Sequence, residues 1–159
     1  MRYSASLLDK LMHRSLTERP GEILPGLPLD ELKESVAADL EALLNTRSTF
    51  SEDERGRYPL AARSVANYGI PDFSSRSLAN GQDRSFICQS IQRSIEQQDK
   101  RLRAVAVSID GQGTAFNCLN FIIRATLVVS NVGEQVSFNA RFESAVQRYT
   151  VARQRTVPR

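Results

Sequence analysis

The chain has 159 residues, of which 41% are hydrophobic and 25% are charged, and its formal net charge is +3. These values are typical of a soluble globular protein with one core, and they exclude collagen-like and wholly disordered proteins. No stretch approaches the roughly 18 consecutive apolar residues of a membrane span, and the N-terminus lacks the pattern of a secretory signal peptide. We therefore expect a cytoplasmic protein.

Charge is distributed unevenly along the chain. Residues 1–99 carry 12 basic and 15 acidic side chains, whereas residues 100–159 carry 9 and 3. The chain has 18 arginines but only 3 lysines, and arginine is favoured where a planar, bidentate contact is made. The basic half indicates either nucleic-acid binding or docking on acidic protein partners.

Residues 1–28 predict a short helix followed by a tether. Leu7, Leu8, Leu11 and Met12 have helical spacing. The tether, residues 17–28, contains three prolines and two glycines, which break helices and strands. A helix this short is marginal alone, so we expect it to be stabilised by docking on its own domain or on a partner.

Two longer amphipathic helices are predicted next. Apolar residues recur every three or four positions over residues 30–46, and isoleucines share one face of residues 83–98. Residues 47–63 and 74–81 are polar and are expected to form surface loops. Between them, residues 64–73 (SVANYGIPDF) predict an ordered turn, since glycine tolerates a positive φ and proline extends the residue before it. The residues that define this turn are Asn67, Tyr68, Gly69, Pro71 and Asp72.

From residue 102 the apolar period changes to two, which predicts three strands separated by turns at residues 110–113 and 131–133. On the third strand, Phe138 and Phe142 should face inward and Ser137, Asn139 and Arg141 outward. The sequence thus predicts an α+β fold in which helices pack on one face of an antiparallel three-stranded meander, with a fourth strand as the alternative. We expect one domain at residues 29–146 and a basic C-terminal tail at residues 147–159.

Most catalytic sites lack candidate residues. The chain has one histidine, His13, and two cysteines, Cys88 and Cys118, which do not form a metal-ligand spacing. The cysteines lie in apolar patterns typical of core or half-buried positions. No nucleophile elbow or phosphate-binding glycine loop is present. We expect neither a metal nor a cofactor.

A carboxylate pair is the one enzymatic alternative. Glu96 and Asp99 lie three residues apart at the end of the second long helix and could share a face, as a muramidase-like peptidoglycan hydrolase would require. Lys100, Arg101 and Arg103 follow at once, and a neighbouring arginine lowers a carboxyl pKa, which is the opposite of what a general acid needs. An ion-paired corner between helix and strand is therefore the favoured interpretation. RNA binding is disfavoured because the outward positions of the third strand carry no aromatic residues.

Four segments together resemble a known family. They are SLLDKL at residues 6–11, the leucine-rich helix ending in LLNTR at residues 35–47, the turn at residues 64–73, and the corner ending in Arg101-Leu102. They resemble the TssE family, the small baseplate-wedge subunits of type VI secretion systems, which is related to the small "lysozyme-like" wedge protein of contractile phage tails. That family typically has Glu-Pro-Arg at the corner, where this chain has Asp99-Lys100-Arg101.

The resemblance implies a structural, non-enzymatic role at the inner face of the cytoplasmic membrane, without insertion into it. The implied partners are the baseplate proteins TssF, TssG and TssK and the contractile TssB–TssC sheath, with no nucleic acid. Asp99, Arg101, Arg103 and Arg141 are the candidate partner-binding residues. We also expect an unpaired edge strand, at residues 136–142, to accept a strand from a sheath subunit.

Overall fold

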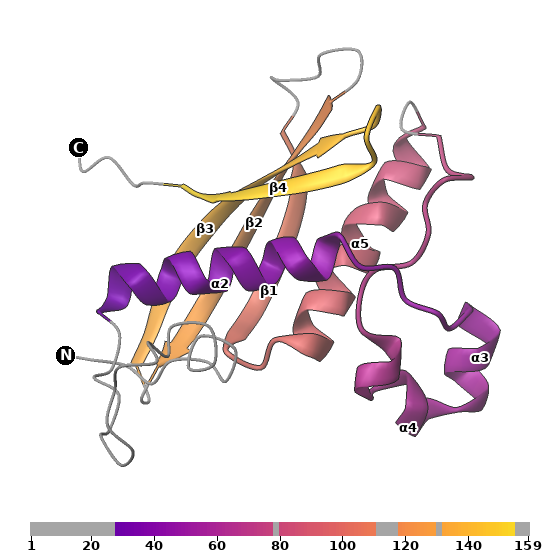
Figure 1. The fold of residues 1–159 in the computed structure, drawn as a ribbon, viewed down its shortest axis with the longest axis horizontal. Coiled ribbons are helices and arrows are strands. Elements are labelled where there is room, and N and C mark those ends of the chain that lie inside the picture. The colour runs from indigo at the N-terminus through magenta and orange to yellow at the C-terminus, as the bar shows by residue number, and fades with distance from the viewer. Residues whose placement is uncertain (1–27, 78–79, 111–117, 130–131, 155–159) are drawn as a thin grey trace, which may run out of the picture.

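The structure is a computed structural model that describes residues 28–77, 80–110, 118–129 and 132–154 (Figure 1). The helix predicted at residues 6–14 and nearly all of its tether lie outside these residues, as does most of the turn predicted at residues 110–113. In the described part of the chain, no helix is long and apolar enough to cross a membrane.

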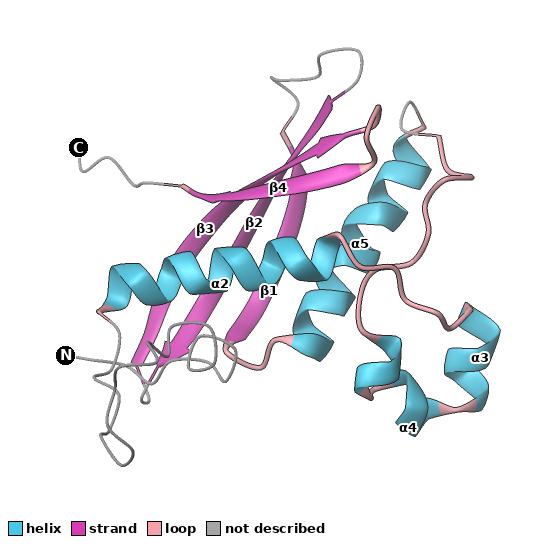
Figure 2. Ribbon diagram, viewed as in Figure 1, coloured by secondary structure: helices cyan, strands magenta, loops and turns pink. Residues whose placement is uncertain are grey.

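Helices and strands are segregated along the chain. The helices are α2 (Leu29–Leu44), α3 (Glu52–Arg57), α4 (Pro59–Ala62), the 3-10 helix η1 (Val65–Asn67) and α5 (Gly81–Gln98). The strands are β1 (Leu102–Ile109), β2 (Cys118–Val129), β3 (Val132–Glu143) and β4 (Arg148–Arg153). They form one antiparallel sheet in the order β1-β2-β3-β4 (Figure 2). The predicted α+β meander is confirmed, in its four-stranded form.

The core lies between the helices and one face of the sheet. Alternate residues of β2 and β3, such as Phe121 and Phe138, are buried against the apolar stripes of α2 and α5. Those stripes are Leu32, Val36, Leu40, Leu43 and Leu44 on α2 and Ile87, Ile91 and Ile95 on α5. The intervening residues of β3, such as Asn139 and Arg141, face outward, as predicted. One face of the sheet is therefore sealed by helices.

The structure corrects two of the predicted loops. Residues 47–63 contain α3 and α4. Helix α3 begins with a capping box, in which the Ser51 side chain accepts from the Glu54 backbone and the Glu54 side chain accepts from the Ser51 backbone. The turn predicted at residues 131–133 is shorter, because Val132 already pairs with Val129 in the sheet.

The folded region also extends past residue 146, where the sequence placed the start of a basic tail. Residues 148–153 form β4, and Tyr149 is only 3% exposed. Its ring packs against Phe142, with ring centroids 4.6 Å apart. This strand begins and ends with arginine, so the sequence pattern did not predict it. Its inward-facing apolar residues, Tyr149 and Val151, pack against the core.

Candidate functional site

The two most specific sequence segments pack directly on each other. Ile70 N donates to Thr46 O at 2.9 Å, and Ser48 N donates to Ile70 O at 2.9 Å. The residue before Ile70 is Gly69, which has φ +115°. A Cβ atom on Gly69 would lie 2.4 Å from Thr46 O. The LLNTR end of α2 and the turn at residues 64–73 thus form a single junction that requires glycine.

The other turn residues fix its shape. The buried side chain of Asn67 donates to Ala62 O at 2.9 Å. The Asp72 carboxylate accepts from both the backbone N and the hydroxyl of Ser74, and these bonds hold the Asp72 pKa below its usual value. Burial raises the pKa of the Tyr68 phenol, helped by the negative charges of Asp39 and Asp99. The turn is therefore held by hydrogen bonds of its own side chains.

Asp99 and Arg101 meet at the corner between α5 and β1. Arg101 Nε donates to Asp99 Oδ1 at 2.9 Å, and Arg101 Nη2 donates to Asp99 Oδ2 at 2.6 Å. The same Nη2 donates to Asp39 Oδ2 of α2 at 2.6 Å. Burial lowers the pKa of the Arg101 guanidinium, but the hydrogen bonds and charges of Asp99 and Asp39 outweigh it and hold that pKa above its ordinary value. The corner is an ionic clamp that ties α2, α5 and β1 together.

Arg103 and Arg141 do not join this clamp. Strand pairing places Arg103 opposite Thr126, and Arg141 opposite both Asn120 and Thr150, on the face of the sheet turned away from the helices. Arg141 interacts there with Glu143, its Nε lying 3.5 Å from Oε1. The four predicted contact residues therefore occupy two separate places.

One further arginine on this open face was not singled out from the sequence. Arg124 on β2 is exposed and shares the outward side with Arg103 and Arg141. The alternation that buries Ile123 and Ala125 predicts Arg124 outward, so the information was present for β2. Among the described residues of β1, β2 and β3, the outward side holds these three arginines and one carboxylate, Glu143. This face therefore carries an excess of basic side chains.

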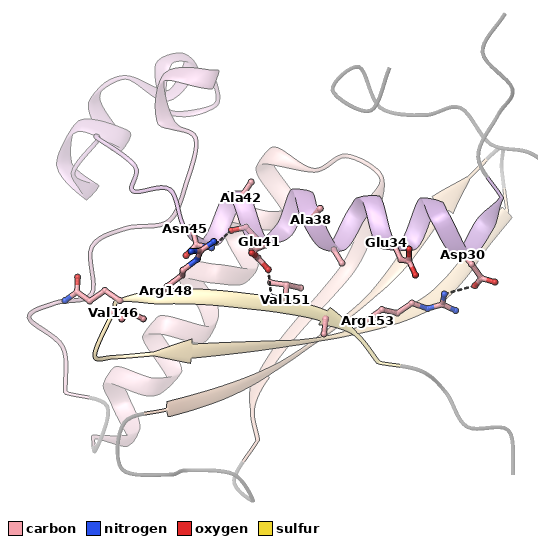
Figure 3. A pocket seen from close by; sticks show the side chains of 13 residues that line it. Asp30, Glu34, Ala38, Glu41, Ala42, Asn45, Val146, Arg148, Val151 and Arg153 are labelled. Atoms are coloured by element: carbon pink, nitrogen blue, oxygen red, sulfur yellow. Dashed lines mark hydrogen bonds and ion pairs between the residues drawn. The ribbon is translucent and has the colours of Figure 1, made fainter. Parts of the chain in front are cut away.

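The β4 edge of the sheet is closed by side chains of α2. Asn45 Nδ2 donates to Tyr149 O at 2.8 Å, and Tyr149 N donates to Asn45 Oδ1 at 2.8 Å. Val151 N donates to Glu41 Oε2 at 2.9 Å. Figure 3 shows the contact of Glu41 with Val151 on the seam between α2 and β4. These side chains occupy outward backbone groups that would otherwise pair with another strand.

A groove of about 1260 Å³ follows the same seam (Figure 3). Its acidic wall includes Asp30 and Glu41 of α2, and its basic wall includes Arg148 and Arg153 of β4. The walls interact with each other, since Arg153 Nη1 donates to Asp30 Oδ1 at 2.6 Å. Two of the five charged residues that line the groove are therefore paired with each other.

The predicted edge strand at residues 136–142 is wrong, because β3 lies between β2 and β4. The other true edge is β1. Asp110 N donates to Asn120 O at 2.8 Å, so by antiparallel alternation the backbone groups of Val107 and Ile109 face away from β2. Beside them is a hollow of about 450 Å³ between β1 and α5. In the described structure, the β1 edge is therefore bordered by a hollow rather than by side chains that bind its backbone, as at β4.

Catalytic chemistry finds little support in this arrangement. Both oxygens of Asp99 accept from Arg101, while Glu96 is exposed and accepts from Gln92 Nε2 at 3.3 Å. Cys88 and Cys118 are half-buried free thiols, and burial raises the pKa of Cys88. The described residues hold no group of three or more side chains suited to a metal ion.

Comparison with known proteins gives a match to solved structures and a match to a family model. A chain from a solved structure, the baseplate complex from the type VI secretion system, aligns with a TM-score of 0.47 and 11% sequence identity over 80% of this chain and 97% of that chain. Among curated proteins, none matches significantly. The family model for baseplate wedge protein gp25 matches residues 30–132, which is more than half of the chain and runs from α2 to the start of β3. The chain belongs to the baseplate wedge protein gp25 family.

Proposed function

We propose that this protein is a structural component of a type VI secretion baseplate, where it joins the wedge complex to the contractile sheath and helps sheath assembly to begin. The observation that carries the proposal is the family match over residues 30–132. The paired LLNTR and NYGIPDF segments, which form one junction, resemble TssE and favour the secretion machine over a phage tail. The role is non-enzymatic and takes place in the cytoplasm at the membrane's inner face.

The proposed wedge partners are the TssF, TssG and TssK proteins. The open sheet face suits them because its arginines present planar donors to partner carboxylates. Arg103 and Arg141 are contacts on this face, and Arg124 extends it. The corner of Asp99 and Arg101 is a second contact. The Arg101 side chain remains 29% exposed there.

The proposed route to the TssB–TssC sheath is the β1 edge. A strand from a sheath subunit would pair with the outward backbone groups of Val107 and Ile109 and fill the hollow beside α5. Val107→Pro removes one outward N–H and should weaken sheath binding while leaving the β1–β2 ladder in place. Ser108→Pro shows the effect of breaking the ladder itself. The backbone N–H of Ser108 points towards β2, so its loss should unfold the sheet. A folded Val107→Pro protein that still starts sheath assembly would exclude this edge.

The primary test is co-expression with the TssF and TssG homologues, followed by size-exclusion chromatography. We expect a stable complex that is weakened by Arg141→Glu on the open face. Arg63→Glu is the matched control, since Arg63 is exposed but lies after α4, outside the sheet. Failure of the folded wild-type protein to co-elute would refute the proposal. Equal weakening by both variants would instead indicate a non-specific charge effect.

A further inference from the structure

A polar cavity of about 290 Å³ lies between α3, η1 and α5, behind the turn at residues 64–73. It is separate from the open sheet face and from the groove of Figure 3. Its lining residues are polar or glycine: Arg55, Asn67, Gly69, Ser90, Arg93, Ser94 and Gln97.

The cavity contains buried hydrogen-bonding atoms without partners. Asn67 is 4% exposed, and its Nδ2 donates to Ala62 O, but its Oδ1 is buried and accepts no hydrogen bond in the described structure. Arg55 Nη2 donates to Ser48 Oγ at 2.7 Å, yet Arg55 Nε is buried and unpaired. Because buried polar atoms are almost always paired, these two atoms of lining residues are an acceptor and a donor that lack the expected partners.

The charge of the cavity is also unbalanced. Arg55 and Arg93 both line it, and none of its lining residues is acidic. Among the described residues, neither arginine forms an ion pair, in contrast to Arg153 in the groove of Figure 3, which pairs with Asp30. Ser90 and Ser94, each 8% exposed, add two hydroxyl groups on the α5 wall. The complementary ligand is an anion that also carries an N–H donor.

We propose that this cavity binds an aspartate or glutamate side chain of a partner protein together with the backbone N–H beside it. Arg93 and Arg55 bind the carboxylate, and Asn67 Oδ1 accepts the N–H. This rests on the proposed function only in taking the ligand to be a protein segment. It gives Asn67 a second role, because the residue that shapes the turn also presents an acceptor to the partner.

The test is an NMR titration of the full-length protein with blocked aspartate, N-acetyl-aspartate N-methylamide. Blocked asparagine, which lacks only the charge, is the matched probe. We expect saturable shifts at the Arg55 Nε–H and Asn67 side-chain signals, with the asparagine probe binding about tenfold more weakly, as loss of a charged hydrogen bond implies. Arg93→Gln should weaken aspartate binding about as much, whereas Arg84→Gln, on the same helix beside the β1 hollow, should not.

Equal responses to the two probes, an unaffected Arg93→Gln protein with a wild-type spectrum, or the absence of saturable shifts at these side chains would each overturn the proposal. The titration contains no baseplate protein, so its outcome is independent of the co-elution test. Probe binding without co-elution would refute the wedge role alone, and co-elution without probe binding would refute this site alone.

Discussion

Replacing Gly69 by alanine should damage the junction between α2 and the turn more than any other single methyl group added to a described glycine. Gly69 has φ +115°, a region that L side chains rarely adopt. The added Cβ would lie 2.4 Å from Thr46 O and 2.7 Å from Thr46 C. Both contacts are with backbone, so no side chain can rotate away to relieve them.

The size of the effect follows from these contacts. Holding a non-glycine residue at such a φ costs about 1–3 kcal/mol. Moving Thr46 O away breaks or stretches the bonds Ile70 N to Thr46 O and Ser48 N to Ile70 O, at about 1 kcal/mol each. We expect Gly69→Ala to lower the free energy of unfolding by about 3–5 kcal/mol, a large share of the stability of a domain this size.

The measurement is equilibrium unfolding in urea, followed by circular dichroism, with the midpoint and the slope compared between variants. Gly56→Ala is the matched control, because Gly56 lies in α3 with no atom within 4 Å of the added Cβ. It should be neutral or stabilising by up to about 1 kcal/mol, since alanine is the better helix former. If Gly69→Ala stays within about 1 kcal/mol of wild type, the junction does not depend on glycine and our reasoning is wrong.

Three other predictions concern the clamp, the blocked edge and the buried tyrosine. Asp99→Asn removes a charge that Arg101 binds through two nitrogens and should cost about 1–2 kcal/mol in urea unfolding, less than a fully buried pair because Arg101 remains partly exposed. Asn45→Ala frees two backbone groups of β4, so sedimentation velocity should show stronger concentration-dependent self-association than in wild type. Burial raises the pKa of Tyr149 to about 12, above its ordinary value of about 10. The neutral phenol therefore contributes about 3 kcal/mol to the free energy of unfolding, which is complete below pH ~10 and is lost as the pH rises towards 12. Tyr149→Phe should flatten this alkaline loss in urea midpoints measured across the same pH range; an unchanged pH profile would contradict the assignment.

Much of the fold could be predicted from local pattern. The apolar spacing of α2 and α5 and the alternation in β2 and β3 identified the elements that carry most of the buried area. Helix α3 was not predicted because it is short and polar, although Ser51 and Glu54 have the spacing of a capping box. Strand β4 was not predicted for a different reason. One of its inward positions is Arg153, which is tolerated there by its ion pair with Asp30, 123 residues away in sequence.

The candidate site shows the same division between local and distant information. Asp99 and Arg101 are two residues apart in sequence, so their ion pair could be predicted from local sequence. Asp39, which completes the clamp, lies 62 residues from Arg101 in sequence. The local sequence around either residue does not predict this contact. The unpaired atoms of Asn67 and Arg55 were likewise invisible, because a missing partner is defined only once the surrounding chain is in place.

The two sheet edges are treated differently, and this difference bears on how a wedge subunit assembles. Asn45 and Glu41 occupy the outward groups of β4, whereas the outward groups of β1 face a hollow. A sheet with two free edges can add strands on both sides and polymerise, or pair with its own copies. With β4 closed by α2, strand addition is confined to β1. With strand addition limited to one side, the subunit cannot be extended through both edges of its sheet, which fits the proposed role at the start of a sheath.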